Sequence, residues 1–93
     1  MDFARRQVQR AGREPVRLTP TEVRLLQLLA RNRGQVLPSA LLLDRAWPDG
    51  GGSVPALWEY VRRLRQKLGD DPRRPELLKT VRGAGYLLAE GEE

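Results

Sequence analysis

The stretch PALWEYVRRLRQKL, residues 55–68, carries the most regular pattern in the chain. Its apolar positions are Leu57, Val61, Leu64 and Leu68. Steps of four, three and four residues place them all on one face of an α-helix. Gly69 follows at once and is typical of a helix end. The polar positions on the opposite face are Glu59, Arg62, Arg63 and Gln66, while Trp58 and Arg65 share one flank. The pattern predicts a helix that buries one face and exposes a basic one.

The tetrapeptide TPTE marks the start of an earlier helix. Thr19 can accept a hydrogen bond as the N-cap, Pro20 suits the first helical position, and Glu22 can reach back to the cap. Apolar residues then recur at helical spacing until Gly34 stops the run. These signals predict a first helix over about residues 20–32.

A second, shorter helix is predicted between the other two. We expect Ser39 to cap this helix, which extends to about Trp47 before Pro48 ends it. Its inner positions are Leu42, Leu43 and Ala46. The next segment, PDGGGSVP, contains three consecutive glycines, which do not support a regular element, so we interpret it as a connecting loop.

Short apolar stretches at both ends of the chain predict β-structure. Residues 1–19 alternate loosely between apolar and polar side chains and are interrupted by Gly12 and Pro15, which favours a small antiparallel sheet. Near the other end, the β-prone segments 77–81 and 86–89 flank a tight turn. Together they predict a hairpin that follows the three helices.

The turn of this hairpin, RGAG, combines two glycines with an arginine. Gly83 and Gly85 predict positive backbone φ angles, and Arg82 places a long charged side chain at the mouth of the turn. The order of elements predicts an α+β fold in a single domain. Its parts are an N-terminal sheet in residues 1–19, a three-helix core in residues 20–68 and a hairpin in residues 77–89.

The composition argues against several classes of function. Histidine and cysteine are both absent, which removes disulfides, most zinc sites, cysteine nucleophiles and histidine general bases. The glycine-rich segments lack the lysine and hydroxyl residues of a P-loop and the length of a dinucleotide motif. We therefore expect no enzyme activity, no cofactor and no metal. No apolar run approaches a membrane span or a signal peptide, so we expect a cytoplasmic protein without a membrane partner.

The basic charge points to a polyanionic partner. The net charge is +5, and 17 residues are lysine or arginine against 12 acidic ones, a balance that favours nucleic acid. An arginine-bearing helix fits the major groove of DNA, which is about 12 Å wide. A thin hairpin beside the helix can carry Arg82 to the neighbouring minor groove, where a narrow, negative slot attracts a guanidinium.

Four motifs occur in a fixed order along the chain: LTPTEVRLLQLLARNRGQVL, LLLDRAW, YVRRLRQKLGDD and LLKTVRGAGYLL. In this order the chain resembles the OmpR/PhoB family, the C-terminal DNA-binding effector domains of bacterial two-component response regulators. The resemblance extends from about Val8 to Leu88. It implies a winged helix-turn-helix fold with a four-stranded N-terminal antiparallel sheet, three helices and a C-terminal hairpin wing.

The resemblance also implies roles for individual residues. The three helix arginines match positions that contact bases and phosphates, Arg82 matches the wing arginine of the minor groove, and the loop after Trp47 matches a segment that contacts RNA polymerase. The candidate DNA-binding residues are Trp47, Glu59, Arg62, Arg63, Arg65, Gln66, Thr80, Arg82, Gly83 and Tyr86. The candidate partner-binding residues are Asp49, Gly50, Gly51, Gly52 and Ser53.

Several of these residues have an alternative interpretation. Arg65 lies near the buried stripe and could form a salt bridge with a carboxylate such as Glu22. Thr80 and Tyr86 are equally suited to packing the hairpin, and Trp47 to anchoring the core. Trp58 stands where relatives often have aspartate; it could pack under an arginine, contact a thymine methyl group or face a partner. Glu59 could accept from cytosine N4 or repel phosphate.

These observations predict sequence-specific binding of double-stranded promoter DNA and regulation of transcription, with the third helix in the major groove and the wing in the minor groove. The resemblance implies a receiver domain in the full-length protein, which this chain lacks, and a monomer that forms tandem dimers on DNA. The alternative is a winged-helix module that contacts RNA polymerase without reading DNA. Binding of single strands is less favoured, because only five aromatic residues are present to stack on bases.

Overall fold

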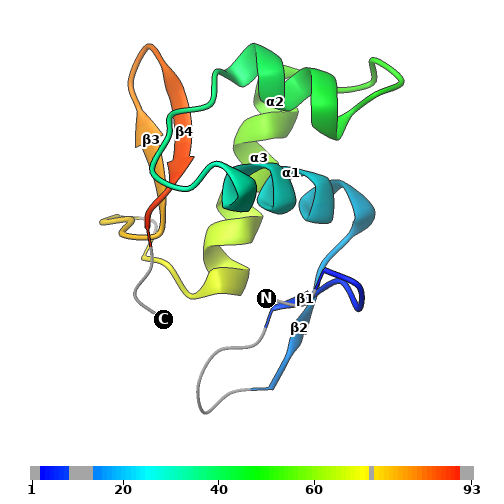
Figure 1. Cartoon of the computed structure of the whole chain (residues 1–93), viewed down its shortest axis with the longest axis vertical. Coiled ribbons are helices and arrows are strands. Elements are labelled where there is room, and N and C mark those ends of the chain that lie inside the picture. Colours follow the sequence, from blue (N-terminus) through cyan, green and yellow to red (C-terminus); the bar gives the residue numbers. More distant parts are fainter. Residues whose placement is uncertain (1–2, 9–13, 72, 91–93) are drawn as a thin grey trace.

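Three helices lie at the centre of the molecule (Figure 1). The computed structural model describes residues 3–8, 14–71 and 73–90. The helices are α1 (Pro20–Arg31), α2 (Ser39–Ala46) and α3 (Val54–Leu68). Each helix packs against the other two. All three were predicted from the sequence, with ends that differ by one residue at most.

The capping box of α1 forms as the sequence predicts. The Thr19 hydroxyl accepts from the Glu22 backbone N–H at 3.2 Å, and the Glu22 carboxylate accepts from the Thr19 N–H at 2.7 Å. α3 has a cap that the sequence reasoning missed, because Ser53 accepts from the Ala56 N–H at 3.2 Å. Gly69 ends α3 with a φ of 73°. Both ends of α3 are therefore fixed locally.

The cap predicted for α2 was wrong. Pro38 is the N-cap, and Ser39 is the first helical residue and makes no capping hydrogen bond. The reason lies outside the helix. Leu37 exchanges two backbone hydrogen bonds with Tyr86, at 2.8 Å and 3.0 Å. This pairing holds the chain extended up to Pro38, which becomes the N-cap, so the helix begins at Ser39, one residue earlier than a capping Ser39 would allow.

The wing is an antiparallel hairpin of β3 (Leu78–Val81) and β4 (Gly85–Leu88). It lies beside α2 and α3 at one end of the molecule (Figure 1). The loop between α1 and α2 pairs with the free edge of β4, through Leu37 and through the Gly34 N–H, which donates to Leu88 at 2.8 Å. The wing is thus attached to the helices by backbone hydrogen bonds as well as by its buried side chains.

Gly85 shows why the turn of the wing needs glycine. Its φ of 151° and that of Gly83, 73°, are both positive, as predicted. A side-chain carbon at Gly85 would also overlap with the backbone carbonyl of Leu37. At Gly83 the space is open. Gly83 therefore serves the turn alone, whereas Gly85 also permits the pairing of the wing with the α1–α2 loop.

The N-terminal sheet is smaller than the resemblance implied. Within the described residues it consists of β1 (Gln7–Val8) and β2 (Val16–Arg17), an antiparallel pair rather than four strands. Residues 3–6 form a turn instead of a strand. Residues 1–2 and 9–13 of the predicted sheet, Gly12 included, lie outside the described part. Val8 and the nearby Leu18 are buried and join the core.

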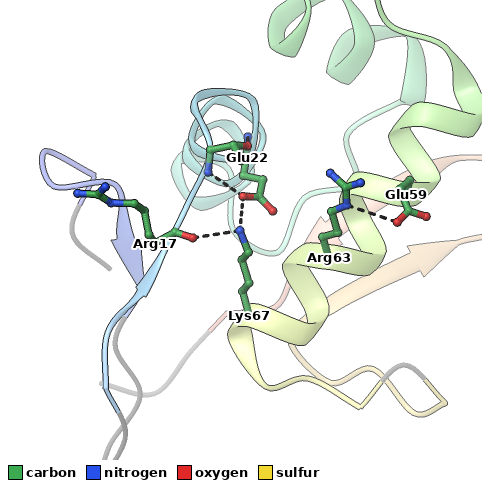
Figure 2. Close-up of polar contacts among 6 residues, drawn as sticks. Arg17, Glu22, Glu59, Arg63 and Lys67 are labelled. Carbon is green, nitrogen blue, oxygen red and sulfur yellow. Dashed lines mark hydrogen bonds and ion pairs between the residues drawn. The ribbon is translucent and has the colours of Figure 1, made fainter.

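A buried ion pair connects this sheet to the helices (Figure 2). Glu22 in α1 is fully buried, and its carboxylate accepts from the Lys67 ammonium of α3 at 2.6 Å. Lys67 also donates to the backbone carbonyl of Arg17 in β2, at 3.0 Å. Three elements therefore meet at one ammonium group, which fixes how α3 lies against α1.

Candidate nucleic-acid interface

α3 presents two different faces. Its buried stripe is the predicted one: Leu57, Val61, Leu64 and Leu68 are each 8% exposed or less. On the opposite face Arg62, Arg63 and Gln66 are exposed to solvent. The sequence prediction of a helix with one buried face and one basic face is confirmed.

Arg63 is held by its neighbours on α3. Its Nε atom lies 3.4 Å from a Glu59 carboxylate oxygen (Figure 2), and its guanidinium carbon lies 5.2 Å from the centre of the Tyr60 ring. Tyr60 in turn meets Trp47 edge to face, with ring centres 5.3 Å apart. The sequence reasoning did not single out Tyr60. The sequence feature that could have indicated Tyr60 is its spacing, because an aromatic residue three positions before an arginine lies on the same face of a helix and can contact the guanidinium.

Trp47 connects α2 to the loop that follows it. The residue is half-buried and packs against the core, as the anchoring interpretation has it. A side-chain carbon at Gly52 would come within 2.6 Å of the Trp47 ring, so the loop lies directly on this tryptophan. Asp49 accepts from the Gly51 N–H at 3.3 Å. The candidate loop residues, from Asp49 to Ser53, thus form a connector seated on Trp47, and all but Gly52 are exposed.

Arg65 faces the wing rather than the exposed side of α3. It donates to the Leu78 carbonyl at 2.9 Å and to the Thr80 hydroxyl at 2.7 Å. The alternative of a salt bridge to Glu22 was wrong, because Lys67 occupies that carboxylate. Side chains two positions apart point about 200° apart around a helix, so Arg65 and Lys67 reach opposite neighbours. Arg65 and Thr80 together join α3 to the wing.

The tip of the wing is exposed and lies across a hollow from α3. Arg82, Gly83 and Ala84 are all exposed. The hollow has a volume of about 360 Å³, and Trp58, Thr80 and Arg82 contribute to its lining. It brings an indole ring of α3 and an arginine of the wing to the same concave surface.

Trp58 is the large apolar residue that stands out on this surface. It is 61% exposed, and Arg65, the arginine under which the sequence suggested it could pack, bonds to the wing instead. Tyr86 differs, since only 5% of it is exposed. Burial raises the pKa of the Tyr86 hydroxyl above its ordinary 10.0, and the charge of Arg65 partly offsets this. The burial of Tyr86 favours packing as its main role.

Asp70 is a structural residue that the sequence reasoning missed. It is 7% exposed, and its carboxylate accepts from the backbone N–H groups of Glu76, Leu77 and Leu78, at distances from 2.8 to 3.2 Å. These bonds shape the turn between α3 and β3. The sequence feature that could have indicated this role is an aspartate just after the end of a helix, in a stretch rich in proline, where such side chains often accept from nearby backbone N–H groups.

Two further observations concern other kinds of function. In the described ranges there is no group of three or more histidine, cysteine or acidic residues placed to hold a metal ion. Nor does that part of the chain contain a helix with the length and apolar character needed to cross a membrane.

The arrangement of a helix with an exposed basic face beside a hairpin with an arginine at its tip is that of a winged helix-turn-helix domain. Residues 12–88 match the family described as "Transcriptional regulatory protein, C terminal". The chain therefore belongs to this family, the OmpR/PhoB-type domains that its motifs indicated. The family comprises transcriptional regulators and is not a class of enzymes.

Individual relatives agree with the family match. The sensory transduction protein RegX3 of Mycolicibacterium smegmatis is 45% identical over 89 residues, which cover 95% of this chain and 39% of RegX3. The chain thus spans about two fifths of the length of that curated relative. The Klebsiella pneumoniae RstA DNA-binding domain, solved in complex with the RstA box, is 34% identical, with a TM-score of 0.78 over 95% of this chain and 87% of RstA's. The CpxR DNA-binding domain of Escherichia coli has a TM-score of 0.74 and 33% identity, over 96% and 87% of the two chains.

Proposed function

We propose that this chain binds double-stranded promoter DNA in a sequence-specific manner and regulates transcription. The observation that carries the proposal is the exposed basic face of α3, with Arg62 and Arg63, on the same helix as Trp58, which lines the hollow together with Arg82 of the wing. The solved complex of the similar RstA domain with the RstA box supports it.

In this proposal the exposed face of α3 enters the major groove and the wing tip enters the adjacent minor groove. Arg63 can bind guanine O6 and N7 with two N–H groups, and Arg82 can occupy a narrow, negatively charged minor groove. Arg62, Gln66 and the backbone of Gly83 are placed to contact phosphates, which supply much of the affinity. Trp58 offers its exposed ring to sugars or a thymine methyl group between the two grooves.

The proposal assigns a different role to Arg65 and Thr80 from that of the other candidates. Because each already bonds the other, their first task is to hold the wing at the correct angle to α3. A phosphate can still approach the exposed Thr80 from outside. Trp47 acts in the same indirect way, by supporting Tyr60 behind the exposed face.

The partners beyond DNA are part of the proposal. We place the chain in the cytoplasm of a bacterial cell, as the effector part of a response regulator whose receiver domain controls pairing of two copies on direct repeats. The loop from Asp49 to Ser53 lies exposed beyond α2, away from the wing tip (Figure 1). This position leaves it accessible to RNA polymerase while α3 is on DNA.

Selection from a random pool of double-stranded DNA tests the proposal. The unaltered chain is expected to enrich a half-site at near-physiological salt, and Arg63→Ala is expected to lose that enrichment. For the enriched duplex, the logarithm of the affinity should fall with the logarithm of the salt concentration by about 0.9 per neutralised phosphate. Equal binding to every duplex would contradict sequence-specific readout, and no binding at low salt would contradict the proposal as a whole.

A further inference from the structure

The Arg63 guanidinium contacts two side chains of α3 in the absence of any ligand. Glu59 lies four residues earlier on α3 and Tyr60 three residues earlier, so both share its side of the helix. The Glu59 carboxylate engages the Nε atom at 3.4 Å, and the Tyr60 ring lies 5.2 Å from the guanidinium carbon. We propose that Glu59 and Tyr60 are positioning residues that hold Arg63 in the orientation in which it binds guanine. This inference rests on the proposed function.

The geometry leaves the outer edge of the guanidinium for the base. The Nε atom forms the ion pair with Glu59, while the two terminal nitrogens have no hydrogen-bond partner in the described part of the chain and point away from the carboxylate (Figure 2). Guanine presents O6 and N7 side by side in the major groove, and a bidentate contact needs two N–H groups that point the same way. The terminal pair satisfies this requirement.

Tyr60, which contacts Arg63, is itself packed against Trp47. Tyr60 is held edge to face by Trp47, at 5.3 Å between ring centres and with the planes 78° apart. Trp47 is covered on another side by Gly52. An arginine side chain loses much rotamer freedom when it binds. A guanidinium that is already held against a carboxylate and a ring loses less of that freedom, so the contact with guanine is favoured.

A simpler role for Glu59 makes the opposite prediction. If the carboxylate only repels phosphate, its removal tightens binding to every duplex and leaves the preference for the selected site unchanged. If Glu59 positions Arg63, its removal tightens binding to unrelated DNA but weakens the preference for the selected site. The ratio of the two affinities therefore separates the roles.

The experiment measures affinities for the selected half-site and for an unrelated duplex of equal length. Glu59→Ala is expected to lower the ratio of the two affinities about twofold, and Glu59→Ala combined with Tyr60→Leu about threefold to tenfold. Tyr60→Phe is the matched control. It retains the aromatic ring beside Arg63, so the ratio of the affinities for the selected half-site and the unrelated duplex should be unchanged. Circular dichroism establishes that each variant is folded.

Spectroscopy of the free chain supplies an independent reading. The ¹⁵N relaxation of Arg63 Nε is expected to report a restricted side chain that becomes mobile in Glu59→Ala. An unchanged affinity ratio in the double variant, or unchanged mobility of Nε, overturns the inference while the proposed function stands. If the unaltered chain binds no duplex, the proposed function fails first and the inference fails with it.

Discussion

Removal of the Lys67 ammonium tests how the buried Glu22 is accommodated. Lys67→Met keeps most of the side-chain volume but leaves a fully buried carboxylate without its cation. Breaking a buried pair from one side costs about 3–5 kcal/mol. The Lys67 side chain is 25% exposed, so water can replace part of the lost bond. The Glu22 carboxylate also keeps the N–H of Thr19. We therefore expect a loss of about 2–3 kcal/mol.

Urea unfolding followed by circular dichroism measures this loss. For a chain of this size it corresponds to a decrease in Tm of roughly 10–20 °C. Arg62→Met is the matched control on the exposed face of α3 and should change the free energy of unfolding by less than about 0.5 kcal/mol. The double variant Glu22→Gln with Lys67→Met should lose less than the two single losses together, because the unpaired charge is gone. A Lys67→Met variant as stable as its control would refute the reasoning.

Five other substitutions have definite expected outcomes. Gly85→Ala should cost about 2 kcal/mol or more and Gly83→Ala about 1 kcal/mol, as measured by urea unfolding, since only Gly85 also faces the Leu37 carbonyl. Asp70→Ala should cost about 2–3 kcal/mol in the same assay, because three backbone N–H groups lose their acceptor. Arg82→Ala should weaken binding to A·T-rich flanks by about 1–3 kcal/mol in a titration, with little effect on other flanks. The folded state keeps the Tyr86 proton to higher pH than the unfolded state, so the free energy of unfolding should fall as the pH rises above 10.0, and Tyr86→Phe should reduce that slope.

The parts of the fold that the sequence predicted are those with local signals. The capping box at Thr19 and the left-handed Gly69 each depend on residues within one turn of a helix, and both formed where expected. The periodic apolar stripe of α3 needs no information beyond its own spacing. The positive φ angles of the wing glycines are local in the same sense.

The errors arose where two distant segments meet. Ser39 is a good cap by composition, but the extended chain that pairs through Leu37 with Tyr86 ends at Pro38, which takes the N-cap position and leaves Ser39 inside the helix. The predicted partner of Glu22, Arg65, was wrong, because whether Arg65 or Lys67 reaches this carboxylate depends on how α3 is rotated against α1. The local sequence carries no record of that rotation, since either side chain is long enough to reach a carboxylate.

The candidate site shows the same division. Arg62, Arg63 and Arg82 were named from charge, pattern and resemblance, and all three are exposed. The contacts around Arg63 were not predicted, because the edge-to-face pair of Trp47 and Tyr60 behind it joins the end of α2 to α3.

The basic residues of α3 thus fall into two groups with different tasks. Arg65 bonds to the wing and Lys67 to α1 and β2, so these two residues fix the position of the helix. Arg62 and Arg63 are turned outward. A helix that is fixed from both sides presents its outward arginines at a constant distance from Arg82. Readout by this surface is therefore expected to depend on the spacing between major-groove and minor-groove contacts as much as on the bases themselves. An insertion of one base pair between them should weaken binding even when every contacted base is kept.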